Sequence, residues 1–157
     1  MQTRRLSLAI AIAAALTSQA WADSKSSSFQ VGVQVVATCS IAAADMTFNT
    51  MTTGTTGVSD AASDITVNCS ENAPYAIALS NGGSYSGGRR LTDGTKFINY
   101  FLYKDPTRAQ SWDAANTLSF VGSGAAQSHT VYGRIPSGQS VPNMGRYTDT
   151  VVATVSY

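Results

Sequence analysis

The sequence is poor in charge and in metal ligands. Charged residues make up only 12% of the 157 residues, and the formal net charge is +1, so the chain lacks the clustered basic residues that nucleic-acid binding requires. One histidine and two cysteines are too few for a zinc site built from four protein ligands. Hydrophobic residues still make up 43%, which argues against disorder. We expect one globular domain without a metal or other cofactor.

Long hydrophobic runs are absent apart from one near the N-terminus. A pair of arginines precedes an apolar run over residues 6–16, and residues 20–22 read Ala-Trp-Ala. This order predicts a secretory signal peptide over residues 1–22, cleaved between Ala22 and Asp23. The run is too short for a membrane anchor, which needs about 20 apolar residues. We therefore expect an exported protein with no integral membrane segment after cleavage, and the arginine pair leaves open Sec or twin-arginine export.

Export changes the interpretation of the two cysteines. Cys39 and Cys69 would lie in an oxidising compartment, where disulfides form and persist. The alternatives are a free reactive thiol and a bridge between two molecules. Because an exported chain with an even number of cysteines favours internal pairing, we predict a Cys39–Cys69 disulfide.

Helical spacing is also missing beyond the signal peptide. Apolar and polar residues instead alternate in short runs, as in β-strands with one buried face. The first run follows a flexible polar lead, residues 23–28, and places Phe29, Val31, Val33 and Val35 on one side. Because turn-forming residues separate the runs, we predict an all-β sandwich or barrel. The further predicted strands cover residues 65–69, 75–79, 97–103, 118–120, 131–135 and 146–157.

Two of these runs carry more specific expectations. Residues 97–103 are apolar and aromatic on both sides, which predicts a strand that is buried on both faces. Residues 146–157 form a long run at the end of the sequence. A sandwich that ends on such a strand presents an unpaired edge, and we expect something to cover it.

Few residues suggest chemistry. His129 follows small residues that predict a loop, and the chain has no G-x-S-x-G motif, so we expect no catalytic residues and no enzyme. Arg89 and Arg90 could bind an anion, but such a pair more often marks the solvated start of a strand. Trp112, in a loop-like segment, is the best candidate for an exposed ring that stacks on a sugar.

Four features of the chain, in order, resemble the spore coat protein U family, which includes the pilin domain of archaic chaperone–usher fimbriae. They are an alternating N-terminal strand that ends at residues 38–41 (TCSI), the second cysteine in residues 65–69 (ITVNC), the aromatic run 98–103 (INYFLY), and the G-x-Y-x-D-T pattern at residues 145–150. The last pattern is the most specific. The resemblance covers residues 29–157 and implies a single domain there.

This resemblance implies an incomplete immunoglobulin-like β-sandwich that lacks its last strand. In the family, a periplasmic chaperone supplies that strand during folding, and the N-terminal strand of the next subunit then replaces it. Residues 29–36 would be the donor strand, with Phe29, Val31, Val33 and Val35 as anchors. The C-terminal strand would line the acceptor groove with Tyr147, Val151, Val152, Val155 and Tyr157.

The implied function is that of a structural subunit of a surface fimbria. Its partners would be a periplasmic chaperone, an outer-membrane usher and neighbouring copies in a head-to-tail fibre. Because only residues 36–38 separate the anchors from Cys39, residues 29–36 could also belong to the domain's own first strand. A secreted coat or adhesive, carbohydrate-binding sandwich is the alternative function. Tip subunits of the family carry a second domain, so the length of this chain favours a structural subunit, either major or minor.

Overall fold

The computed structural model describes residues 22–55, 57–141 and 143–157. The predicted signal peptide, apart from Ala22, lies outside the described residues. The chain divides into two units, Met1–Gln34 and Val35–Tyr157. In the first unit, residues 22–34 are exposed and form neither helix nor strand. No helix in the described ranges is long and apolar enough to cross a bilayer.

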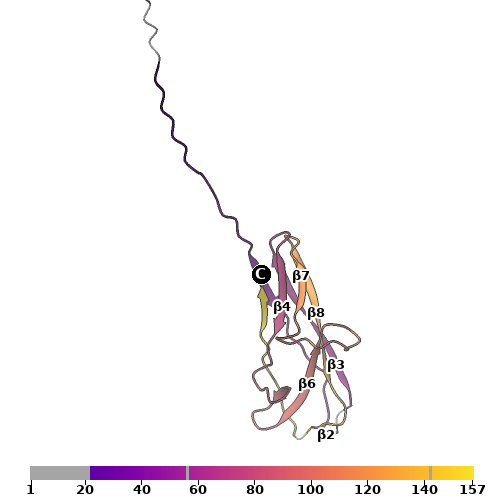
Figure 1. Cartoon of the computed structure of the whole chain (residues 1–157). Helices are drawn as coiled ribbons and strands as arrows, with labels where there is room; N and C mark the ends of the chain where they lie inside the picture. Colours follow the sequence, from indigo (N-terminus) through magenta and orange to yellow (C-terminus); the bar gives the residue numbers. More distant parts are fainter. Residues whose placement is uncertain (1–21, 56, 142) are drawn as a thin grey trace, which may run out of the picture. The chain divides into compact units, whose positions relative to one another are not determined.

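The second unit consists of antiparallel β-strands (Figure 1). The strands are β1 Cys39–Ala43, β2 Gly54–Thr55, β3 Ser59–Cys69, β4 Pro74–Leu79, β5 Arg89–Thr92, β6 Phe97–Tyr103, β7 Leu118–Val121, β8 Ala126–Ile135, β9 Ser140–Val141 and β10 Ala153–Ser156. A five-stranded sheet has the order β1-β3-β8-β6-β5, a three-stranded sheet has the order β10-β4-β7, and β2 pairs with β9.

The two larger sheets share one hydrophobic core. Alternation along each strand places apolar side chains on one face. In the five-stranded sheet these include Ile65 and Val67 of β3 and Val131 of β8, and in the three-stranded sheet Ile77 and Leu79 of β4. Because these residues form a single cluster, the sheets pack face to face. The predicted all-β sandwich is confirmed.

The aromatic strand β6 is buried on one face only, so the prediction of burial on both faces was wrong. Alternate residues from Ile98 to Leu102 are buried in the core, whereas Phe97 and Phe101 are 43% and 46% exposed. The three-stranded sheet covers one face of β6 and leaves the other open. The guanidinium of Arg90 lies 4.0 Å from the centroid of the Phe97 ring, and this cation–π contact helps to accommodate an aromatic ring on the outer face.

Trp112 and Arg89 connect the two sheets inside the sandwich. The prediction of an exposed Trp112 was wrong, because its side chain is fully buried and its Nε1 donates to the carbonyl of Ile77 at 3.0 Å. Arg89 starts β5 as predicted, but it is buried rather than solvated. Its guanidinium donates to the carbonyls of Trp112 (2.9 Å) and Ser80 (2.7 Å). Burial lowers the pKa of Arg89, and these carbonyls compensate the buried charge.

The C-terminal segment contains less strand than predicted. In place of one strand over residues 146–157, Thr148 forms an isolated bridge with Thr92 of β5, and β10 begins only at Ala153. Ala153 lies opposite Leu79 of β4. The segment therefore passes from the five-stranded sheet to the three-stranded sheet, and this passage interrupts the ladder of hydrogen bonds.

Candidate strand-acceptor groove

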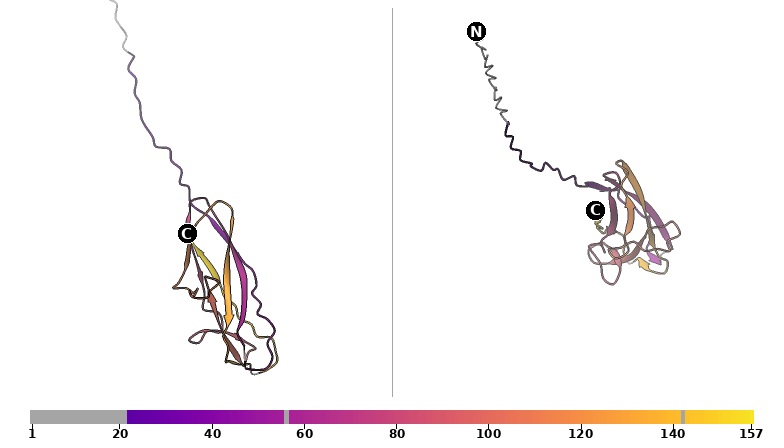
Figure 2. Two further views of the ribbon diagram at one scale, coloured as in Figure 1. Left: turned by 90° about the vertical axis from the view of Figure 1, so that its right-hand side faces the viewer. Right: turned by 45° about the horizontal axis from the view of Figure 1, so that its top comes forward.

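A groove lies between the segment that follows β1 and the C-terminal segment. Residues 43–48 form one wall, residues 146–151 and Ala153 form the other, and the cavity has a volume of about 580 Å³. The groove lies where both sheets end, because β1 and β10 are outer strands of their sheets. Strands β1 and β10 come close to each other near the C-terminus (Figure 2).

The floor of the groove is apolar. It includes Ile65 of β3, Leu79 of β4, Leu102 of β6 and Val131 of β8, all of which belong to the buried core. Since these residues come from both sheets, the groove opens directly onto the centre of the sandwich. Filling it with apolar side chains would remove apolar surface from water, at about 25 cal/mol per Å².

The C-terminal wall directs backbone groups into the groove. The carbonyl of Val152 accepts the Ser80 N–H at 2.8 Å, and the carbonyl of Thr150 accepts the Gly83 N–H at 3.2 Å. The backbone carbonyls of Thr150 and Val152 therefore point toward β4 and the residues that follow it. Successive residues of an extended chain point opposite ways, so Val151, which lies between them, directs its N–H and C=O toward the groove.

The opposite wall has the same arrangement. The Ala44 N–H donates to the Asp64 carbonyl, and the Ser70 N–H donates to the Thr38 carbonyl, both at 2.9 Å. Even-numbered residues of this strand thus bond to β3, and odd-numbered residues such as Ile41 direct their backbone groups away from it. Two strand edges of this kind can accept a further β-strand between them.

Asp149 fixes the position of the C-terminal wall. Its Oδ1 accepts the N–H groups of Gly83 (2.8 Å) and Ser84 (3.2 Å), and its Oδ2 accepts the hydroxyl of buried Tyr100 at 2.7 Å. Burial, and then the hydrogen bond to Asp149, raises the pKa of Tyr100 far above its ordinary value, so the hydroxyl stays protonated and donates. Gly82 has a positive φ of 84°, and a Cβ at this position would collide with the Asp149 carboxylate.

The five predicted groove residues fall into three groups. Tyr147 and Val151 line the groove. Val155 packs against the core and is partly buried. Val152 and Tyr157 are mostly exposed and lie outside the groove lining. The division follows the alternation of the segment, which turns Val151 and Val155 inward and Val152 outward.

The four predicted anchors are exposed. Phe29, Val31, Val33 and Val35 have exposed fractions between 85% and 89%. Large apolar side chains grouped in this way at exposed positions are typical of an interaction surface. Residues 22–34 form no strand, although this segment carries the alternation that is typical of a strand with one apolar face.

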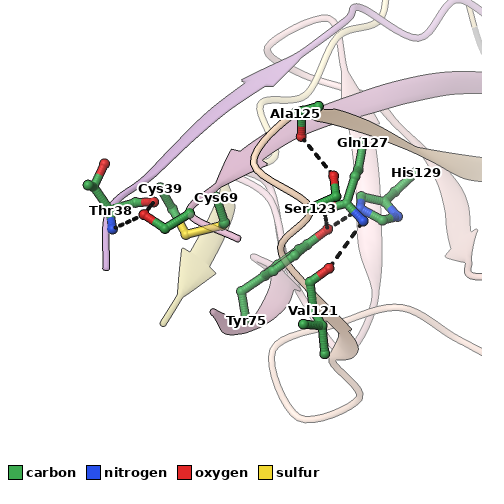
Figure 3. The surroundings of a disulfide bond; sticks show 10 residues. Thr38, Cys39, Cys69, Tyr75, Val121, Ser123, Ala125, Gln127 and His129 are labelled. Carbon is green, nitrogen blue, oxygen red and sulfur yellow. Dashed lines mark hydrogen bonds between the residues drawn. A yellow bond between two sulfur atoms is a disulfide. The ribbon is translucent and has the colours of Figure 1, made fainter. Parts of the chain in front are cut away.

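The predicted Cys39–Cys69 disulfide is present and lies at the start of β1 (Figure 3). It joins β1 to the last residue of β3, in the register in which Cys39 lies opposite Cys69. Beside it, the Thr38 N–H donates to Ser70 Oγ at 3.0 Å. The beginning of β1 is therefore fixed to β3 by both a covalent bond and hydrogen bonds.

His129 lies in β8 and not in the predicted loop. Its ring is buried and stacks on Phe120 with 3.9 Å between centroids, while Nε2 lies 2.7 Å from the Tyr75 hydroxyl oxygen (Figure 3). Burial lowers the pKa of His129, which favours the neutral ring. Its environment is that of a core residue. The residues described include no group of three or more His, Cys, Asp or Glu side chains that could hold a metal ion.

Two parts of the groove were missed in the sequence. Residues 43–48 form a wall, and the alternation of Met46 and Phe48 with Thr47 was the signal that could have revealed it. Asp149 was noticed only as a letter of the closing pattern. Its role could not be read from the sequence, because its partners Gly83 and Tyr100 are distant along the chain.

Comparison with known families agrees with this geometry. The model of the Spore Coat Protein U domain matches residues 25–154. The chain belongs to the Spore Coat Protein U domain family. Among curated proteins, Protein U of Myxococcus xanthus is 45% identical over 65 residues, which are 40% of this chain and 36% of that protein. This member of the family therefore aligns with little more than a third of that relative's length.

A solved structure supports the same family at the level of the fold. It is the crystal structure of the CsuC–CsuE chaperone–tip adhesion subunit pre-assembly complex from archaic chaperone-usher Csu pili of Acinetobacter baumannii. One of its chains matches with a TM-score of 0.59 and 26% identity, over 78% of this chain and 40% of that chain. The Spore Coat Protein U domain described above thus has an immunoglobulin-like β-sandwich that is similar in fold to a chaperone–usher pilus protein.

Proposed function

We propose that this chain is a structural subunit of a surface fimbria, assembled by the chaperone–usher route through donor-strand exchange. The observation that carries the proposal is the apolar groove between two strand edges whose free backbone groups face it. The exposed segment 29–35 has the alternation that such a groove requires. In this proposal, segment 29–35 of one copy fills the groove of the next.

The physical basis is strand addition. Backbone groups of the donor pair with those of the two walls, and the four anchors enter the apolar floor. At about 1.5–3 kcal/mol for each buried side chain, the anchors contribute roughly 6–12 kcal/mol. The donor also separates β1 from β10, which are in contact in the chain described here. Because each copy gives a strand at one place and receives one at another, the contact is head-to-tail and produces an open filament.

The proposed partners are those that the family implies. A periplasmic chaperone would occupy the groove before assembly, an outer-membrane usher would be the place of exchange, and the fibre would stand on the cell surface. The similarity to a chain of a chaperone–subunit complex supports the chaperone. We propose no catalytic activity. The alternative function, a carbohydrate-binding adhesive or coat protein, is weakened because its best stacking residue, Trp112, is buried.

The test compares two charges placed one residue apart. Val33→Asp puts an unpaired carboxylate into the apolar groove of the neighbour, at a cost of several kcal/mol. Gln34→Asp adds the same charge on the other side of the segment and is the matched control. Each variant is expressed with the chaperone and usher, and surface-sheared material is separated on denaturant-free gels, where ladders report donor-strand polymers.

We expect the Val33→Asp chain to be recovered folded with its chaperone but to give no ladder. The Gln34→Asp chain should give a ladder like that of the wild type. A wild-type ladder from Val33→Asp would make residues 29–35 an ordinary exposed segment. A Val33→Asp chain that cannot be recovered folded even with the chaperone would place the segment in its own core.

A further inference from the structure

The junction between the donor segment and β1 decides which molecule can fill the groove. We propose that residues 36–38 prevent segment 29–35 from entering the groove of its own chain, so that the strand that fills the groove comes from a second copy. This inference rests on the proposed function, because it concerns the same groove and the same segment. Two arrangements within one chain have to be considered, one for each direction of the inserted segment.

Insertion in the same direction as β1 is excluded by reach. An extended strand from Phe29 to Val35 is about 20 Å long. With all the anchors in the groove, Val35 would lie at the far end, and the chain would have to return to Cys39 at the near end. Only residues 36–38 are available for this return, and they allow at most about 14 Å between Val35 and Cys39.

Insertion in the opposite direction would need a tight hairpin over residues 36–38, but Thr38 is already engaged. Its N–H donates to Ser70 Oγ at 3.0 Å, its carbonyl accepts the Ser70 N–H at 2.9 Å, and the disulfide holds the next residue. The backbone groups of Thr38 therefore face β3. They cannot at the same time form the closing pair of a two-residue hairpin loop on the groove side. A three-residue loop over residues 36–38 would close on Val35 and Cys39 and would place Thr38 inside the turn.

The junction also lacks the residues that tight turns use. Two-residue hairpin loops need residues with positive φ, usually Asn or Gly, and three-residue loops place a left-handed residue at the end of the loop. The junction reads Val36-Ala37-Thr38, and positive φ is a steric outlier for β-branched residues such as Val36 and Thr38. None of these three residues has a positive φ in the structure.

This short junction matters because, with a longer junction, insertion of the segment into the groove of its own chain would be favoured over insertion into a neighbouring copy. A segment tethered by a short flexible linker has an effective concentration in the millimolar range, well above the concentration of neighbouring copies in solution. A junction that blocks insertion within one chain leaves each groove available to the donor segment of another copy, and each donor segment available to the groove of another copy. The same three residues thus favour polymers over closed monomers.

The test lengthens the chain at two positions. In the junction variant, Gly-Ser-Gly-Ser-Gly-Ser-Gly-Ser is inserted between Val36 and Ala37, which extends the reach of the junction to at most about 43 Å. In the matched control, the same insert stands between Ser28 and Phe29, where it lengthens the tail without freeing the anchors. We expect the junction variant to become a soluble monomer without the chaperone and to give no ladder. The control should need the chaperone and give a ladder.

A third variant identifies what fills the groove. Adding Val33→Asp to the junction variant should remove the inserted strand from the groove. The groove should then bind a synthetic peptide of residues 27–36, whereas the junction variant without this substitution should not bind the peptide. A junction variant that gives the same ladder as the control would overturn the inference, and so would a wild-type chain found as a self-filled monomer. If wild type and control gave no ladder, and the peptide bound none of the chains, the proposed function would fail as well.

Discussion

Two parts of the chain carry the same alternation of apolar and polar residues and yet differ completely in burial. In β4, Tyr75, Ile77 and Leu79 are no more than 3% exposed, whereas the apolar residues of segment 29–35 are at least 85% exposed. The sequences are equally suited to a strand with one buried face. The difference is that β4 pairs with β7 and β10, while residues 29–34 belong to no strand. Alternation therefore predicts that a face is buried, but not in which molecule.

Placing one charge in each of the two regions should give the largest contrast. Ile77→Asp puts an unpaired carboxylate at a fully buried position, and this cost of several kcal/mol is comparable with the 5–15 kcal/mol stability of a typical domain. We expect no folded protein by circular dichroism. Val33→Asp should leave the recovery of the folded chain with its chaperone unchanged. Equal losses from the two substitutions would show that segment 29–35 packs in its own domain.

Both cysteines of the disulfide lie between segment 29–35 and β4 in the sequence. Removal of the disulfide should give the next largest effect. The loop that it closes has a sequence separation of 30, so replacing both cysteines with serine should lower the free energy of unfolding by about 3–4 kcal/mol. Urea denaturation measures the loss. The wild type under reducing conditions is the control and should lose the same amount. An unchanged urea midpoint would mean that the bond adds nothing to the stability of the sandwich.

A substitution at Gly133 tests whether the groove wall formed by residues 43–48 contributes to the binding of a donor strand. A Cβ at this position in β8 would collide with Met46 Sδ and lie 2.9 Å from Phe48 Cζ, and both of these side chains line the groove. Gly133→Ala should therefore cost about 1–3 kcal/mol of stability and weaken binding of the donor peptide 27–36. Gly88→Ala is the matched control, because a Cβ there meets nothing within 4 Å. Unchanged peptide binding by Gly133→Ala would separate this wall from strand acceptance.

The smallest expected effect concerns pH and the buried region alone. The pKa of His129 in the folded protein is below its ordinary value of 6.5 because the ring is buried, so the unfolded state binds the proton more readily. The contribution of the neutral ring is fully present above about pH 6.5 and is lost as the pH falls through that value toward the folded pKa. His129→Gln does not titrate and can still bond to Tyr75.

Thermal midpoints between about pH 7.5 and pH 5 check this prediction. The wild type should lose stability as the pH falls, and His129→Gln should give a flatter profile over the same range. Because the chain has a single histidine, the difference between the two profiles reports this one group. Identical profiles would assign the acid response to the carboxylates.

Much of the sandwich could be predicted, because its strands follow local alternation. The predicted ranges 65–69 and 75–79 lie within the observed strands β3 and β4, although β3 begins six residues earlier, at Ser59. The disulfide was predictable because an export signal and an even number of cysteines do not depend on three-dimensional detail. These features are encoded within a few neighbouring residues, and such signals can be read without a structure.

The errors concern residues whose environment comes from distant parts of the chain. Trp112 lies in a polar, loop-like sequence, and it is buried because its indole reaches the carbonyl of Ile77, 35 residues away. His129 follows small residues that suggest a loop. It nevertheless belongs to β8, because β8 pairs with β3 over its whole length. Asp149 accepts a hydrogen bond from the hydroxyl of Tyr100, which is 49 residues away in the sequence. Local pattern does not report these contacts, so the walls of the groove could be predicted only in part.

The position of the disulfide has a mechanical consequence for a fibre of the proposed kind. Tension carried by segment 29–35 would enter the domain at Thr38 and Cys39, at the start of β1, whose hydrogen-bonded neighbour within its own chain is β3. Pulled from its end, such a strand would peel away one rung at a time. The covalent bond stands at the start of that ladder and passes the load into β3, which is held by β1 and β8 on its two sides. Under reducing conditions, the same point would become the place where a stretched fibre begins to tear.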